Sequence, residues 1–525
     1  MNTIEFLQIS SAVVPDREAL VDIGGSGKRI TYGEMYPLVT RLANALQGLG
    51  VEHGQKVAVM SVNSADYVVT YYACAMLGAT FVPLNYRAKD EELTHMLNVS
   101  QCQAVFVSDR YIDLVERIRP TLTHTQHFIA YEGGIGNYLD YNQLIEHASE
   151  DDIWTDVDDH DATILIFTSG TTALPKGVVL TFLDLTAYVT NTMAPADPEM
   201  HEKTLVSAPF FHIAGATAMM SSIWGGRTLV ILPAFTPEGW LQAVHEEGAT
   251  HSFVVPTMLK RIMEVPSFEQ NYNLGTLQLI TYGAAPMPYE VVRKACDIFP
   301  PRGVGLMNAY GQTESTSTLT FLGPEDHDLS VDTEVREHRL RSVGRPMPDV
   351  EIGIMDERNH LLGPNEEGEI CVRSDRVMKG YYKQEDATST AIIDGWLHTG
   401  DVGKVDDGGY LFITGRKKDL IIRGGENISP GEIENCLEDH PAIEEAAVIG
   451  VPDADWGEVV KAVLVLKEGA KTSAEEVMEY TKSRLSSFKA PQYVAIVDEL
   501  PRNAMGKVLK NDLRKMYGTA TNDRA

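Results

Sequence analysis

Cysteine is scarce in this sequence, and the cysteines that it has lie far apart. They form no CxxC pair, which argues against a disulfide scaffold or a zinc-ribbon site. Such spacing is typical of reduced, mostly buried thiols in a cytoplasmic protein. The five are Cys74, Cys102, Cys296, Cys371 and Cys436.

Positive charge is also in short supply. Lysine and arginine together number 44 against 74 acidic residues, so the formal net charge is -30. A protein that binds nucleic acid or anionic membranes in general would need the opposite balance. Any anionic substrate must therefore be bound by a local cationic site that works against the field of the whole protein.

Long, uniformly apolar segments are missing as well. Two long uncharged runs, 67–86 and 204–226, are interrupted by Pro83, Pro209 and several glycines, whereas a membrane-spanning helix needs about 20 predominantly apolar residues. The N-terminus, MNTIEF, lacks the basic start of a signal peptide. We therefore expect no membrane span and a cytoplasmic location.

The length of 525 residues predicts at least two domains, because a single hydrophobic core does not grow to that size. Apolar runs such as Lys56–Met60 alternate with helical patterns, which is typical of parallel α/β architecture. From 345 to 415 the segments are short and broken by glycine, which favours a small antiparallel sheet. The chain then becomes highly charged, and a compact α+β tail follows. We place the boundary between an N-terminal domain, 1–416, and a C-terminal domain, 417–525.

The stretch Thr163–Val178, TILIFTSGTTALPKGV, is the strongest local signal of a binding site. Its apolar start, 164–167, predicts a buried strand that leads into hydroxyl residues and glycine. Glycine lets the backbone approach a ligand closely, consecutive N–H groups in such turns bind anions, and Lys176 adds a positive charge. This chemistry suits a polyphosphate, and a Gly/Thr-rich surface turn is the plain alternative. The P-loop of kinases is excluded, because Lys176 precedes Gly177 instead of following it.

Three further motifs each have a chemical and a plain structural interpretation. Glu314 in YGQTE can offer a hard oxygen ligand to Mg²⁺ or simply start a helix. Asp401 in WLHTGD can accept hydrogen bonds from a ribose diol or be an ordinary turn residue. Lys507 in PRNAMGK is, from the residues alone, a solvated surface lysine.

Two apolar motifs are similarly open. His212 lies in PFFHIAG, and a lone histidine in an apolar run is more often a core residue than a catalyst. The small residues of GAAP, 283–286, follow a buried strand and suit either a flat ligand or a tight strand-to-helix turn.

In their order along the chain, these motifs resemble those of the AMP-forming adenylating superfamily, which includes acyl-CoA synthetases, luciferases and the adenylation domains of peptide synthetases. The loop resembles the family signature S/T-S-G-S/T-T-G-x-P-K-G and departs from it at Ala173, where glycine is usual. If position 173 needs a positive φ, alanine costs about 1 kcal/mol there, and we expect activity to survive. The resemblance covers nearly the whole chain. It implies a large α/β domain of parallel subdomains with a small antiparallel β subdomain, followed by a mobile α+β C-terminal domain.

The resemblance also implies roles for individual residues. The catalytic set is Lys507, Thr168, Glu314 and His212, where Glu314 binds the magnesium of Mg-ATP and His212 positions the substrate. Lys418 is the hinge between the domains, and a loop of Arg423, Gly424, Gly425 and Glu426 faces coenzyme A after the small domain rotates. The implied nucleotide-binding residues are Thr168, Ser169, Gly170, Thr171, Thr172, Lys176, Gly283, Ala284, Ala285, Asn308, Ala309, Tyr310, Gly311, Thr313, Asp401 and Arg416. The implied acyl pocket is formed by Phe211, His212, Gly215, Ala216, Gly283 and Ala284.

The implied enzyme is an acyl-CoA synthetase, with ATP, a carboxylic acid and coenzyme A as its partners and Mg²⁺ as its cofactor. No acidic residue lies in 210–216, where amino-acid-activating relatives place an aspartate, and Met219, Met220 and Trp224 are nearby. We therefore expect a medium-chain, alicyclic or aromatic acid. Two alternatives stay open: an adenylate-forming enzyme with another acceptor or oxygen, as in luciferases, and an inactive nucleotide-binding regulator. Retention of Lys507 argues against the regulator. A homodimer is left open.

Overall fold

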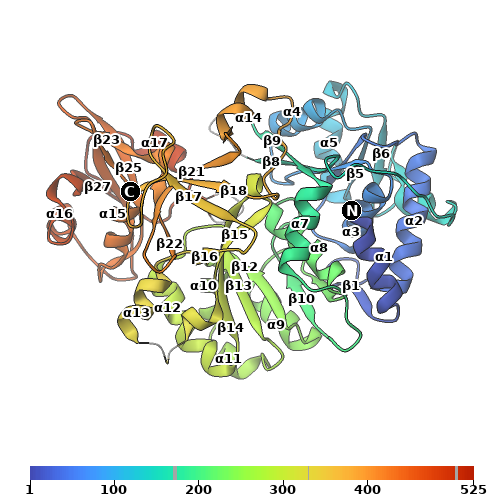
Figure 1. Cartoon of the computed structure of the whole chain (residues 1–525), viewed down its shortest axis with the longest axis horizontal. Coiled ribbons are helices and arrows are strands. Elements are labelled where there is room, and N and C mark those ends of the chain that lie inside the picture. The colour runs from blue at the N-terminus through green and yellow to red at the C-terminus, as the bar shows by residue number, and fades with distance from the viewer. Residues whose placement is uncertain (169–173, 329, 331, 503–506, 525) are drawn as a thin grey trace.

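The computed structural model describes residues 1–168, 174–328, 330, 332–502 and 507–524. A large N-terminal domain, blue to yellow-orange in Figure 1, is flanked by a smaller red C-terminal domain. The strands of the described residues form four sheets. No helix in this part of the chain is both long and apolar enough to cross a membrane. The mixed α/β fold with a small antiparallel sheet and a small C-terminal domain, as predicted from the sequence, is confirmed.

One sheet carries the strand that leads into the predicted phosphate loop. Its order is β19-β9-β8-β4-β3-β5-β6-β7. The strands from β8 to β7 are parallel, whereas β8 and β9 pair antiparallel, with Thr168 opposite Lys176. The two ends of the predicted loop are therefore neighbours. The strands are β3 (Lys56–Met60), β4 (Thr80–Pro83), β5 (Ala104–Val107), β6 (His127–Ala130), β7 (Leu139–Asp140), β8 (Ala162–Thr168), β9 (Lys176–Thr181) and β19 (Gly380–Tyr381).

The second sheet brings the GAAP and YGQTE motifs together. Its order is β16-β15-β14-β13-β12-β10-β11-β1-β2, with a parallel centre and antiparallel edges. Gly283 lies opposite Ala309 in the register of β13 and β14, so both motifs lie at the carboxyl end of the parallel strands. The strands are β1 (Glu18–Asp22), β2 (Arg29–Thr31), β10 (Lys203–Val206), β11 (Thr228–Ile231), β12 (His251–Val254), β13 (Leu279–Gly283), β14 (Gly305–Gln312), β15 (Ser317–Leu322) and β16 (Arg345–Pro346).

Helices fill the space between these two sheets and bury one shared apolar core. The first turn of α2 is held by a capping box, in which Thr31 and Glu34 bond to each other's backbone N–H. Trp224 at the end of α8 packs on Phe6 of α1. Met219, Met220 and Trp224, which the sequence suggests as pocket residues, are all buried in this core. The core helices are α1 (Ile4–Val13), α2 (Tyr32–Gly48), α3 (Ala65–Met76), α6 (Tyr141–Glu146), α7 (Phe182–Thr192) and α8 (Ile213–Trp224).

Other helices cover the outer faces of the two sheets and complete separate cores. Helices α4 (Asp90–Ser100) and α5 (Ile112–Ile118) cover the first sheet. The second sheet is flanked by α9 (Pro237–Glu247), α10 (Pro256–Met263), α11 (Phe268–Asn271), α12 (Tyr289–Ile298) and α13 (Thr333–Leu340). Short 3-10 helices are η1 (Asp109–Tyr111), η2 (Arg119–Thr121), η3 (Pro300–Arg302), η4 (Thr313–Ser315), η5 (Pro324–His327), η6 (Lys417–Asp419) and η7 (Ser487–Lys489).

The third sheet is antiparallel and holds the WLHTGD motif. Its path is β17-β18-β21-β20, and β22 pairs with β21. Asp401 on β21 lies directly opposite Arg416, the last residue of β22. Since η6 follows at once, this pair lies where the chain leaves the third sheet. The elements are β17 (Glu351–Met355), β18 (Gly368–Arg373), α14 (Glu385–Ala391), β20 (Ile392–Ile393), β21 (Trp396–Val405) and β22 (Leu411–Arg416).

The C-terminal part has its own sheet and its own two apolar cores. The sheet order is β24-β23-β26-β27-β28, and β25 pairs antiparallel with β26. The alternation of helix and strand after 429 that the sequence indicates is present. The elements are β23 (Ile421–Arg423), β24 (Glu426–Ile428), α15 (Pro430–Glu438), β25 (Ile443–Asp453), β26 (Gly457–Leu466), α16 (Ala474–Lys482), β27 (Tyr493–Val497), α17 (Lys510–Tyr517) and β28 (Asp523–Arg524).

A buried arginine links the segment after β18 to the second sheet. Arg376 is 0% exposed; its Nη1 donates to the carbonyl of Thr318 at 3.0 Å, and its Nη2 donates to Asp349 Oδ1 at 3.0 Å. The Thr316 hydroxyl donates to the Arg376 carbonyl at 2.7 Å. Arg376 therefore holds the chain beside the YGQTE motif.

We predict that Arg376→Met destabilises the protein by about 3 kcal/mol or more, because it removes one member of a buried ion pair. Chemical denaturation followed by tryptophan fluorescence measures the loss. Arg373→Met is the matched control: the exposed Arg373 pairs with the exposed Glu351, and such surface pairs contribute about 1 kcal/mol at most. Equal stability of the two variants would contradict the prediction.

Candidate active site

The site is built around a buried carboxylate. Asp401 is 4% exposed. The Tyr310 hydroxyl donates to Asp401 Oδ2 at 2.8 Å, and Arg416 Nε pairs with Oδ1 at 2.8 Å. Burial, together with the Asp401 charge, raises the pKa of Tyr310, so its hydroxyl stays protonated and can donate. Asp401 lies within strand β21, so the structure differs from the turn alternative weighed from the sequence.

Lys507 reaches the same place from the C-terminal domain. It is half-buried. Burial, followed by the positive charge of Arg416, lowers the pKa of Lys507 to about 7, and Asp401 acts in the opposite direction. Lys418 and Asp419 act on it as well, so the lysine lies among the charges of β21, β22 and η6. The structure therefore differs from the plain alternative of a solvated surface lysine, because the tertiary fold surrounds Lys507 with ionic groups.

Glu314 is held by a residue that the motif analysis missed. The Tyr381 hydroxyl donates to Glu314 Oε1 at 3.0 Å, and Lys176 Nζ lies 5.2 Å from the centre of the Tyr381 ring. Tyr381 is on β19, which pairs with β9 so that Tyr381 is opposite Val178. Tyr381 thus bridges the end of the predicted phosphate loop and the predicted metal ligand. A two-residue strand has no periodicity that could have revealed this contact.

Close backbone contacts fix the small residues of the GAAP and YGQTE motifs. A Cβ on Gly283 would lie 2.1 Å from the Ala309 carbonyl oxygen, and one on Gly311 would lie 1.7 Å from that of Ser317. Ala284 has a φ of +66°, in the left-handed region. Packing alone therefore demands glycine at 283 and 311. Asn308 and Ala309, each 9% exposed, continue this surface along β14.

His212 lies at the N-cap of α8 in an aromatic setting. Its ring centre is 4.3 Å from that of Phe211, which packs edge-on against Tyr86 at 5.1 Å. Burial lowers the pKa of His212 to about 4, so the imidazole is neutral at pH 7. Its Nε2 is buried and has no hydrogen-bond partner among the described residues. Gly215 follows in the first turn, where a Cβ would lie 2.3 Å from the Pro209 carbonyl oxygen.

The remaining predicted residues lie at several separate places in the fold. Thr168 ends β8 and Thr313 begins η4, while Ala285 follows Ala284 beyond β13 and Ala216 is buried in α8. Lys418 lies in η6, and burial followed by the Arg416 charge lowers its pKa. The loop 423–426 is the turn between β23 and β24, and Arg423 lies 5.3 Å from the Trp456 ring of its own domain. Ser169, Gly170, Thr171, Thr172 and the departure at Ala173 lie outside the described residues.

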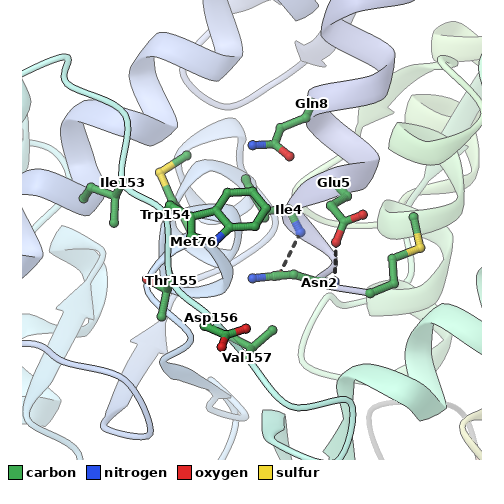
Figure 2. Close-up of a pocket in the computed structure, with 11 residues that line it drawn as sticks. Asn2, Ile4, Glu5, Gln8, Met76, Ile153, Trp154, Thr155, Asp156 and Val157 are labelled. Carbon is green, nitrogen blue, oxygen red and sulfur yellow. Dashed lines mark hydrogen bonds between the residues drawn. The ribbon is translucent and has the colours of Figure 1, made fainter.

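Two pockets lie in the N-terminal domain, one away from these motifs and one beside the strands that carry the ends of the predicted phosphate loop. One of about 130 Å³ lies between the start of α1 and segment 153–157 (Figure 2), where Asn2 bonds to Ile4 and Glu5. The other, of about 650 Å³, is lined by Lys56, Lys379 and Lys383 and includes Tyr381. None of the predicted acyl-pocket residues lines either cavity.

The chain is similar to known proteins over nearly its whole length. The model of the AMP-binding enzyme family matches residues 7–382, and that of the AMP-binding enzyme C-terminal domain matches residues 432–507. The chain is 34% identical over 514 residues to an indoleacetate–CoA ligase of Aromatoleum aromaticum. The match covers 96% of this chain and 98% of that protein. It is 35% identical over 496 residues to a feruloyl-CoA synthase of Amycolatopsis, at 94% and 95% coverage. The crystal structure of ATP-bound MatB from Rhodopseudomonas palustris matches with a TM-score of 0.87, 29% identity and 99% coverage of both chains.

The chain therefore belongs to the AMP-binding enzyme family. Within it, its class is that of the AMP-forming acid–CoA ligases. The superfamily resemblance that the motifs indicate is confirmed.

We predict that the amine of Lys507 titrates near pH 7 in the ligand-free protein. Competitive acetylation at a series of pH values, quantified by mass spectrometry, measures this directly, with the exposed Lys515 as internal reference. Asp401→Asn should lower the Lys507 pKa further, because the Asp401 charge raises it, and Arg416→Gln should raise it. A labelling profile identical to that of Lys515 would contradict the prediction.

Proposed function

We propose that the protein activates a free carboxylic acid in two half-reactions. The acid first attacks the α-phosphorus of ATP and gives an acyl-adenylate and pyrophosphate. The thiol of coenzyme A then attacks the adenylate and gives acyl-CoA and AMP. The observation that carries the proposal is the convergence of four residues from both domains. Asp401, Arg416 and Tyr310 come from three strands of the N-terminal domain, and Lys507 comes from the C-terminal domain.

Lys507 is the proposed catalytic cation. The carboxylate substrate is already ionised at pH 7 and needs no base, but its attack brings one anion onto another. A positive charge at that point stabilises the transition state, and loss of one such group typically lowers the rate by about 10²–10³-fold. Asp401 and Arg416 would hold the ribose and the phosphate beside it. The backbone of 283–285 and 308–311 would line the adenine.

Glu314 is the proposed ligand of Mg²⁺. One of its oxygens accepts from Tyr381, and the half-buried carboxylate can offer the other, which fits an ion that prefers carboxylate and phosphate oxygens. When bound, Mg²⁺ would neutralise phosphate charge. Thr168, Lys176 and the loop between them would hold the phosphates that leave as pyrophosphate.

The second half-reaction requires the C-terminal domain to move, with Lys418 as the proposed hinge and 417–525 as the moving unit. The ion pairs between the domains are compatible with such a movement. Arg341–Asp439 and Lys260–Glu444 are both partly exposed, and ion pairs of this kind add little to the stability of one domain orientation. Rotation would turn Arg423, Gly424, Gly425 and Glu426 towards coenzyme A.

The acid is proposed to be medium-chain, alicyclic or aromatic, with aromatic acids preferred. Phe211 packs between His212 and Tyr86, and Tyr86 stacks on Tyr111 at 5.9 Å. His212 is uncharged at neutral pH, so it would orient the substrate and would not pair with it. Two of the relatives are named as an indoleacetate–CoA ligase and a feruloyl-CoA synthase. Acids with aromatic rings suit the aromatic side chains of Phe211 and Tyr86.

Pyrophosphate release with Mg-ATP across a panel of carboxylic acids, with and without coenzyme A, tests the function. We expect aromatic acids to stimulate release, coenzyme A to convert it into steady production of AMP and acyl-CoA, and Lys507→Ala to lose about 10²–10³-fold in the adenylation rate. Lys510→Ala, a nearby lysine that pairs with Glu434, is the matched control and should keep the parent rate.

Three outcomes would overturn parts of the proposal. ATP binding without release for any acid would favour a nucleotide-binding regulator. Release that coenzyme A leaves unchanged would indicate another acceptor, and consumption of oxygen would indicate luciferase-type chemistry.

Tyr381→Phe provides an independent prediction about the phosphate end of the site. It removes the hydroxyl that orients Glu314, so we expect the KM for Mg-ATP to rise about tenfold, which corresponds to the loss of one hydrogen bond to a charged group. Tyr382→Phe, at the adjacent position, is the control. The idea fails if both variants keep the parent KM, or if raising the Mg²⁺ concentration does not partly restore Tyr381→Phe.

A further inference from the structure

Three side chains with metal-binding chemistry meet on the small antiparallel sheet. Glu369 and Cys371 are two residues apart on β18 and therefore share one face of the sheet. His398 lies opposite Cys371 on the neighbouring strand β21. His398 Nδ1 lies 3.0 Å from Glu369 Oε2 and 3.4 Å from Cys371 Sγ, and all three ligand atoms lie within 4.8 Å of one another. The cluster shares no residue with the proposed catalytic set.

These separations suit a tetrahedral ion. Zn²⁺ binds nitrogen and oxygen at about 2.0–2.2 Å and sulfur at about 2.3 Å, so tetrahedral ligands lie about 3.3–3.7 Å apart. The two distances from His398 Nδ1 need shifts of only a few tenths of an ångström. A thiolate with an imidazole and one carboxylate favours Zn²⁺ or Co²⁺ over Mg²⁺.

From this geometry we propose that Glu369, Cys371 and His398 form a binding site for Zn²⁺ or a similar transition-metal ion, with solvent as the fourth ligand. The side chains of His398 and Glu369 are 8% and 10% exposed, and Cys371 is fully buried, so the ligands are already ordered by packing. Such preorganisation reduces the entropic cost of binding.

Protonation is compatible with this site. Binding releases the Cys371 thiol proton to solvent, because a coordinating thiol is deprotonated. An imidazole that binds the ion through Nδ1 carries its ring proton on Nε2. His398 Nε2 already lacks a hydrogen-bond partner among the described residues, so metal binding leaves no additional buried nitrogen unpaired.

One cation now competes for the site. Lys417 Nζ pairs with Glu369 Oε2 at 3.0 Å, while Gly400 N donates to Oε1 at 3.2 Å. The Lys417 side chain is 57% exposed, so its ammonium returns to water when it leaves Glu369. A divalent ion can therefore displace the ammonium at small cost, and removal of Lys417 should tighten metal binding.

Titration of the full chain with Co²⁺, followed by absorption spectroscopy, tests the site. We expect a thiolate-to-cobalt charge-transfer band in the near ultraviolet with visible bands of a four-coordinate ion, and Zn²⁺ should abolish both. Cys371→Ser should lose the charge-transfer band, His398→Asn should weaken binding by more than about tenfold, and Lys417→Met should strengthen it. Cys436→Ser, at another buried thiol, is the matched control and should keep the band.

The proposal is overturned if the parent protein shows no charge-transfer band with excess Co²⁺, or if the band survives in Cys371→Ser. Equal loss in Cys436→Ser overturns it too. Circular dichroism of each variant checks folding, and the gain expected from Lys417→Met cannot arise from a misfolded protein.

Discussion

The ion pair between Asp401 and Arg416 is the interaction on which the site depends. A carboxylate that is only 4% exposed must be paired or hydrogen-bonded, because an isolated buried charge is very costly. The antiparallel register of β21 and β22 supplies Arg416, and the neighbouring sheet supplies Tyr310. Since Arg416 is also the last residue before η6, the same pair anchors the point where the chain enters the C-terminal domain.

This pair also sets the electrostatics of the domain junction. The protein as a whole carries a formal net charge of -30, yet Arg416, Lys418 and Lys507 gather at one place. Partial burial, and next to it repulsion by the Arg416 charge, lower the pKa values of Lys507 and Lys418. A bound polyphosphate would relieve that repulsion. The cluster therefore provides local positive charge that favours a bound anion, although the net charge of the protein is negative.

The third sheet does more than carry Asp401. Glu369 binds the backbone of Gly400, next to Asp401, and also contacts His398 and Lys417. Arg376, which follows β18, fixes the chain beside Glu314. The same small sheet thus connects the proposed nucleotide-binding motif, the domain junction and the proposed ligand of Mg²⁺. Its few strands have to satisfy several buried polar groups at once.

The sequence by itself determined the fold class, the strand before the phosphate loop and the motif residues, because these depend on local periodicity and on residues close together in the chain. It also indicated Asp401, Glu314 and Lys507 through a family resemblance. Only the tertiary structure decided that Tyr381 holds Glu314, that Met219, Met220 and Trp224 belong to the core, and that Lys507 lies among ionic groups. Those facts depend on strand register and domain packing between distant residues, and no local pattern encodes which distant side chain will complete a buried charge.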